Sequence, residues 1–178
     1  MNEQHKINEA RYFLGRLNSS HESPAEYSYD LSAFLSAARS ALQYALEEAK
    51  TRSGGQAWYD GAVSASNEVR FFKSKRDINI HAEPVLPNRK INIQETINLT
   101  ISDSLRVTVY RADGTIERDT KMEASPPRSP PNASSSVTTT YFFRDWPGTE
   151  DVEALCNKYI SDVQGIVDDG QGRGILTP

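Results

Sequence analysis

The sequence has little of the chemistry from which metal centres, disulfide frameworks and common cofactor sites are built. Its 178 residues include one cysteine and three histidines. A single cysteine closes no internal disulfide, and no set of cysteines and histidines has the spacing of metal ligands. The glycines at 54–55 and 170–172 match neither a dinucleotide-binding fingerprint nor a phosphate-binding loop, and no serine nucleophile elbow is present. We therefore expect no metal and no cofactor.

Long apolar runs and a strong charge of one sign are also missing. No stretch approaches the roughly 20 apolar residues of a membrane-spanning helix, and residues 1–10 lack the apolar core of a signal peptide. We expect no membrane partner and a cytoplasmic location. The net charge is −4 and the pI is near 5.4, so the chain as a whole does not attract nucleic acid. Any nucleic-acid site therefore has to be a local patch.

A helical pattern predicts an antiparallel helical bundle over residues 1–87. Apolar residues recur at helical spacing in two segments within residues 7–46. The second segment has a strong start signal at Ser23-Pro24-Ala25-Glu26, which combines a capping serine, a proline at the first helical position and a glutamate three residues after the cap. The helical pattern continues over residues 56–82, and the sequence leaves open whether it breaks near residues 64–67.

Alternating apolar and polar residues then predict a small antiparallel β-sheet lobe over residues 88–148. The alternation runs through most of residues 91–109, as in strands with one buried face. Ala112-Asp113-Gly114 predicts a hairpin turn, and the β-branched and aromatic residues of 137–143 predict a further strand. Residues 124–136, rich in proline and serine, predict a loop with polyproline character or, alternatively, a ligand for an aromatic-groove domain.

A C-terminal amphipathic helix is predicted within residues 149–178, packing on the preceding elements. We expect Thr149 to cap it, with Glu150 and Asp151 in its first turn. Cys156 lies on the apolar stripe of this helix, so we interpret it as a buried structural thiol with a raised pKa. The order of helices, strands and a final helix predicts an α+β fold.

The stretch FFKSKRDINIHAEP, residues 71–84, holds the main candidate for chemistry. Asp77 and His81 are four residues apart, so on a helix they share a face and can hydrogen-bond. The carboxylate would orient the imidazole and raise its pKa, which suits a general acid or base. Arg76 is turned about 140° from His81 around a helix, so it would reach a shared site by a long sweep or from a neighbouring subunit.

Positive charge gathers around this stretch. Residues 70–90 hold six basic and two acidic side chains, a local net charge of +4 that could hold phosphates. Arg70, Lys73 and Lys75 are therefore candidate phosphate- or RNA-binding residues. A competing interpretation is that basic residues favour a helix C-terminus because of the helix dipole, with His81 as a helix-end residue.

The pattern Arg76, Asp77 and His81, R-x-x-x-x-H after a run of helices, resembles the motif of the HEPN superfamily (the higher eukaryote and prokaryote nucleotide-binding domains). The resemblance covers about the first half of the chain. It implies a homodimer formed through the helical bundle, and a metal-independent endoribonuclease of the toxin or defence type found in bacteria. It also implies that His81 serves the proton transfers, Arg76 stabilises charge on the phosphate, and Asp77 orients the site.

The resemblance also supports a second hypothesis, because some members of that superfamily are non-catalytic. The chain would then be an interaction or nucleotide-binding module in which Arg76, Asp77 and His81 are structural or interfacial. The partners to consider under the two hypotheses are RNA or a nucleotide, a second copy of the chain, and an antitoxin or other protein.

Overall fold

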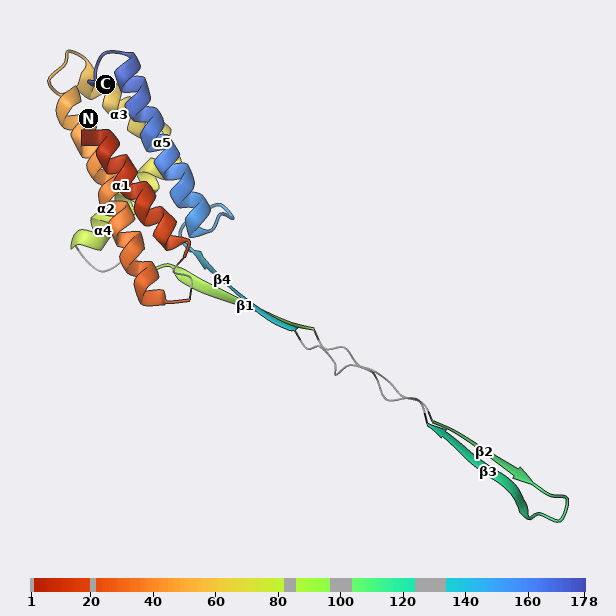
Figure 1. Cartoon of the computed structure of the whole chain (residues 1–178). Coiled ribbons are helices and arrows are strands. Elements are labelled where there is room, and N and C mark those ends of the chain that lie inside the picture. The colour runs from red at the N-terminus through yellow and green to blue at the C-terminus, as the bar shows by residue number, and fades with distance from the viewer. Residues whose placement is uncertain (1, 20–21, 82–85, 97–103, 124–133) are drawn as a thin grey trace. The chain divides into compact units, whose positions relative to one another are not determined.

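The computed structural model describes residues 2–19, 22–81, 86–96, 104–123 and 134–178. Within these ranges, the side chains of residues 76–81 and of four strand ends are not described; the strand ends are Thr96, Ser104, Glu123 and Ser134. The protein is α+β, as predicted, with helices α1–α4, then strands β1–β4, then helix α5 (Figure 1).

The chain forms two compact units. Unit 1 is Met1–Ile91 together with Thr139–Pro178, and unit 2 is Asn92–Thr138. Unit 1 contains all five of the described helices. None of the helices in the described part of the chain combines the length and apolar content that crossing a membrane requires.

Helices α1 (Asn2–Leu17) and α2 (Pro24–Ala49) lie side by side in unit 1 (Figure 1). The predicted start of α2 is confirmed, because the Ser23 side chain accepts a hydrogen bond from the Glu26 N–H at 3.4 Å. The buried face of α2 is rich in small residues, which let neighbouring helices approach closely; its buried alanines are Ala37, Ala38, Ala41, Ala45 and Ala49.

Helices α3 (Gly55–Ala65) and α4 (Asn67–His81) are separated by a single residue, Ser66. Ser66 has φ −96° and ψ 124°, an extended conformation that ends α3. Its hydroxyl accepts a hydrogen bond from the Val69 N–H at 3.0 Å and so caps α4. The break that the sequence left open is therefore real and lies at Ser66.

Helix α5 (Val152–Gly172) contacts all four other helices of unit 1. Its N-cap is Asp151, whose carboxylate accepts from the Ala154 N–H at 2.8 Å. The prediction of Thr149 as the cap is wrong by two residues. The Glu150 side chain is bound by Trp146 and Lys158, so this residue belongs to the connection before the helix rather than to its first turn.

Aromatic side chains join the helices in the core. The Phe72 ring of α4 stacks on the Tyr159 ring of α5 with centroids 4.8 Å apart, and Phe34 of α2 meets Tyr159 edge-on at 6.1 Å. Cys156 is fully buried, and this burial raises the pKa of its thiol well above the usual value. The interpretation of Cys156 as a structural core residue is confirmed.

Within the described residues, the strands form a two-stranded sheet of β1 and β4 and another of β2 and β3. Strand β1 (Asn88–Thr96) pairs with β4 (Ser134–Phe142), and β2 (Ser104–Tyr110) pairs antiparallel with β3 (Ile116–Glu123).

The predicted turn between β2 and β3 is confirmed. Gly114 adopts φ +83°, a left-handed conformation that favours glycine, and the Asp113 carboxylate accepts from the Thr115 N–H at 3.0 Å. Of the predicted proline- and serine-rich loop, residues 124–133 lie outside the described residues, and 134–136 belong to β4. Predicted strand residues 97–101 also lie outside them.

Candidate functional site

Helix α4 carries all of the residues predicted to do chemistry. The helix runs without interruption from Asn67 to His81, so Arg76, Asp77 and His81 occupy its last two turns. Asp77 and His81 are therefore one turn apart on one face of α4, which is the spacing that a hydrogen bond between them requires. Their side chains lie outside the described part of the structure.

The position of Arg76 follows the buried face of α4. Val69 and Phe72 are both fully buried in the core of unit 1. Arg76 is seven residues after Val69 and four after Phe72, so it shares their register to within about 20–40° around the helix. By its position on the helix, Arg76 thus continues the row of Val69 and Phe72, the two fully buried residues among the described side chains of α4.

Asp77 and His81 follow a different row, which begins with two exposed basic residues. Arg70 and Lys73 are exposed, and Asp77 is four residues after Lys73. The Arg70 guanidinium donates to the Asn67 side-chain oxygen at 2.5 Å, within the first turn of the same helix. The row therefore places the positive charge of Lys73 one helical turn before the position of Asp77.

Lys75, the third predicted phosphate ligand, is held inside unit 1. Its side chain is only 15% exposed, and its Nζ lies 2.7 Å from a carboxylate oxygen of Asp145. The same ammonium lies 5.3 Å from the ring centroid of Phe71 and 5.0 Å from that of Phe143. Lys75 therefore joins α4 to the end of β4 and the connection that follows, and its charge already has partners.

The aromatic residues around Lys75 form one cluster. The Phe71 ring meets Phe143 edge-on with centroids 5.4 Å apart, and meets Trp146 at 5.0 Å. These contacts fix the connection between β4 and α5 against α4. The rigid wall that results borders an open groove on the side of Arg70.

This groove has a volume of about 660 Å³ and combines aromatic, basic and acidic groups. Its lining includes Arg70, Phe71, Trp146 and Glu150. The Trp146 indole N–H donates to the Glu150 carboxylate at 2.8 Å. Hydrogen bonds from Lys158 and Trp146 lower the pKa of Glu150 to about 2, so this carboxylate is ionised at neutral pH. Such a groove can stack a flat ring and offer Arg70 to an anion.

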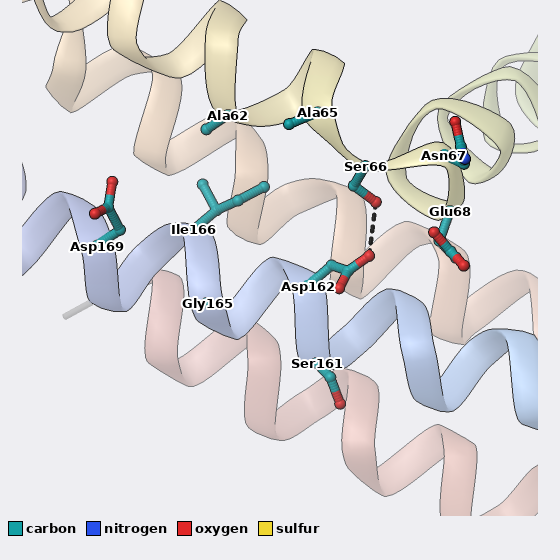
Figure 2. A pocket seen from close by; sticks show the side chains of 10 residues that line it. All are labelled: Ala62, Ala65, Ser66, Asn67, Glu68, Ser161, Asp162, Gly165, Ile166 and Asp169. Atoms are coloured by element: carbon teal, nitrogen blue, oxygen red, sulfur yellow. Dashed lines mark hydrogen bonds between the residues drawn. The ribbon is translucent and has the colours of Figure 1, made fainter.

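A second hollow, of about 480 Å³, lies where α3 ends, α4 begins and α5 passes them (Figure 2). Ser66 points toward Asp162 and donates to its carboxylate at 2.6 Å, whereas Ser161 points away. Asp169, at the far end, accepts from Trp58 and from Arg173, each at 2.7 Å. Because these acidic groups bind protein partners and would repel phosphate, we interpret this hollow as a helix junction.

Among the residues that the structure describes, both hollows border the start of α4. Both are lined by Asn67 and Glu68, and the groove is also lined by Arg70, which precedes Arg76 by about 9 Å along the helix axis. No group of histidine, cysteine and acidic residues among the described side chains could hold a metal ion.

Comparisons with known proteins add no further assignment. No protein-family model matches the sequence, and searches of curated proteins and of solved structures found no match. The resemblance to the HEPN superfamily therefore rests on the motif and the helices that precede it.

Sequence reasoning did not identify Trp146 and Glu150 as site residues. Glu150 was expected only as a first-turn acid of the last helix, and Trp146 had no predicted role. The available signal was the segment Trp146-Pro147-Gly148, an aromatic residue before two turn-forming residues. Its proximity to Arg70 depends on tertiary packing, which local sequence does not reveal.

Proposed function

We propose that this chain is a HEPN-like endoribonuclease that acts without metal, as a homodimer, through Arg76 and His81. The observation that supports it is the continuity of α4, which places Asp77 and His81 on the row that Arg70 and Lys73 begin. A bacterial toxin or defence role inside the cell follows from the same resemblance.

In the proposed reaction, neutral His81 takes the proton of a ribose 2′-hydroxyl, and that oxygen attacks the adjacent phosphorus. The bond from phosphorus to the 5′-oxygen breaks, and this oxygen leaves with the proton that His81, now an imidazolium, gives up. The products are a 2′,3′-cyclic phosphate and a 5′-hydroxyl. Arg76 stabilises the negative charge that develops on the phosphate oxygens. Asp77 orients the imidazole.

A second subunit explains how Arg76 and His81 act on one phosphate. On α4 they are turned about 140° from each other, and Arg76 follows the register of the buried Val69 and Phe72. A cleft between two copies of α4 brings Arg76 of one chain to His81 of the other. Exposed Arg70 and Lys73 hold the flanking phosphates.

The experiment is cleavage of labelled single-stranded RNA in the presence of a chelator. We expect the parent chain to cleave, and His81→Ala and Arg76→Ala each to lose about 10²–10⁴ of the rate. Matched controls are His5→Ala and Arg52→Ala, because both of these residues are exposed and lie on other elements of unit 1. An inactive parent chain, or a fully active His81→Ala variant, would refute the proposal.

The groove beside Arg70 favours the alternative function, a non-catalytic nucleotide-binding module. It offers the rings of Phe71 and Trp146 and the guanidinium of Arg70. Phe71 and Arg70 precede Arg76 by about 7.5–9 Å along the helix axis. Under this alternative, the parent binds RNA or nucleotide without cleaving it. Binding is then lost in Arg70→Ala and retained in His81→Ala.

A further inference from the structure

One face of the β2–β3 hairpin is apolar and exposed. Directly opposed residues of an antiparallel pair share a face, and the register opposes Leu105 to Met122 and Val107 to Thr120. Val109 lies on the same face, two residues along β2 from Val107. The exposed fractions are 60% for Leu105, 43% for Val107, 41% for Val109 and 62% for Met122. Because a lone two-stranded hairpin is at best marginally stable in water, this hairpin gains from a further strand.

The two outer edges of the hairpin differ in charge. Strand β3 alternates acidic and basic residues from Glu117 to Glu123, a pattern that discourages pairing with another strand. Strand β2 has one charged residue, Arg106, and its guanidinium Nε already donates to Asp119 of β3 at 2.9 Å. Among the described strands, β2 has β3 as its single neighbour. Within the part of the chain that the structure describes, the outer edge of β2 is therefore open and carries little charge.

The sequence of β2 is self-complementary about Val107. If a two-fold axis relates two copies of β2 at this residue, Val107 lies opposite Val107 of the second copy. Leu105 then lies opposite Val109 of the second copy. Arg106 then opposes Thr108, so no like charges are directly opposed. An axis at Arg106 would oppose two guanidinium groups, and an axis at Thr108 would set Leu105 against Arg111. Of these three positions, only Val107 pairs all three aliphatic side chains of β2 with aliphatic ones.

The backbone N–H and C=O groups that face the open edge of β2 belong to the residues that this pairing requires. The Arg111 N–H donates to the Thr115 carbonyl at 2.7 Å, so Arg111 directs its backbone groups toward the returning strand. The register irregularity places the extra residue in β3, which leaves the alternation along β2 continuous. Arg106 and Thr108 therefore direct their backbone groups to the open edge. They are the residues that an axis at Val107 makes a hydrogen-bonded pair.

We infer that the outer edge of β2 is a dimerisation surface for a second copy of this chain. The two β2 strands pair antiparallel about Val107 and form a four-stranded sheet in the order β3–β2–β2–β3. The exposed apolar faces of the two hairpins become one continuous face. This surface is independent of the proposed ribonuclease function, since that function uses Arg76 and His81 on α4.

Cysteine crosslinking of the full chain tests the position of the axis. In Val107→Cys, the two introduced cysteines occupy a non-hydrogen-bonded pair of positions, with Cα atoms about 4.5 Å apart. This distance lies within the range of about 4.4–6.8 Å that a disulfide accepts. The native Cys156 is fully buried and gives no background. Mild oxidation is expected to shift this variant from 19.9 kDa to twice that mass, and a reductant reverses the shift.

The matched control is Thr120→Cys, which lies directly opposite Val107 on the same face of the hairpin. In the four-stranded sheet its two copies are three strand spacings apart, about 14 Å, so it stays monomeric on oxidation. A monomeric Val107→Cys variant overturns the inference and points to another partner or to the chain's own helical unit. Equal crosslinking of Val107→Cys and Thr120→Cys also overturns it, because it indicates unspecific adhesion of hairpins.

Proline substitutions separate edge pairing from contact between faces. Thr108→Pro removes an N–H from the open edge of β2 and leaves the β2–β3 hydrogen bonds in place. Lys121→Pro makes the same change on the outer edge of β3. Added to Val107→Cys, Thr108→Pro is expected to abolish the crosslink, and Lys121→Pro to retain it. Retention with both prolines, or equal loss with both, contradicts pairing through the β2 edge.

Discussion

Lys73 and Lys75 are two residues apart on α4, and the structure assigns them different physical roles. Lys73 is exposed, whereas the Lys75 side chain is 15% exposed and bound to Asp145. We predict that Lys75→Met destabilises unit 1 and that Lys73→Met does not. Methionine keeps most of the apolar stem, so each change removes mainly the charge.

The magnitude follows from the contacts of the Lys75 ammonium. Its two cation–π contacts, at 5.3 Å and 5.0 Å from the rings of Phe71 and Phe143, contribute about 0.5–1 kcal/mol each at a partly exposed site. The ion pair adds less, about 0.2–1 kcal/mol, because Asp145 is 62% exposed. Allowing for water that replaces part of these contacts, we expect a loss of about 1–2 kcal/mol.

Urea unfolding measures this loss. Both tryptophans, Trp58 and Trp146, lie in unit 1, so their fluorescence reports on that unit alone. For Lys75→Met we expect the unfolding midpoint to fall by about 0.5–1 M urea. For Lys73→Met we expect a change in the free energy of unfolding within about 0.5 kcal/mol, together with weaker RNA binding. Equal midpoints for the two variants would refute the structural role of Lys75.

Three further predictions concern Ser66, Glu150 and Cys156. Ser66→Ala should lower the free energy of unfolding by about 0.5–2 kcal/mol because α4 loses its N-cap, as measured by urea unfolding; an unchanged midpoint would contradict the cap. The pKa of Glu150 is lowered from 4.5 to about 2, so its stabilising effect is complete above pH 4.5 and is lost as the pH falls toward 2. Glu150→Gln should therefore flatten the acid limb of a stability–pH curve over this window, and a curve as steep as the parent's would count against it. Cys156 is fully buried, so a thiol reagent should label it only in urea, and rapid labelling of the native chain would argue against this burial.

Local chemistry made several elements predictable. Ser23 to Glu26 starts α2 where the sequence indicated, because a serine, a proline and a glutamate each satisfy a separate requirement of a helix N-terminus. The Asp113-Gly114 turn is also decided within a few residues, since one of them supplies a local hydrogen bond and the other a left-handed conformation.

Long-range contacts made other features unpredictable. Lys75 was a candidate phosphate- or RNA-binding residue, and its ion pair could not be foreseen because its partner Asp145 is 70 residues away in the chain. Thr149 appeared as the cap of the last helix because the sequence does not show that Glu150 binds Trp146 and Lys158 before that helix begins. The candidate motif was visible only as a spacing, and the groove near Arg70 became visible only in the packed structure.

The most direct test of the proposed ribonuclease mixes two inactive variants, His81→Ala and Arg76→Ala, under conditions that exchange subunits. If one cleft takes Arg76 from one chain and His81 from the other, each mixed dimer has one complete site. Random mixing then restores about one quarter of the parental rate of RNA cleavage in chelator. No recovery in the mixture, with both variants folded and dimeric, would contradict a cleft shared between subunits.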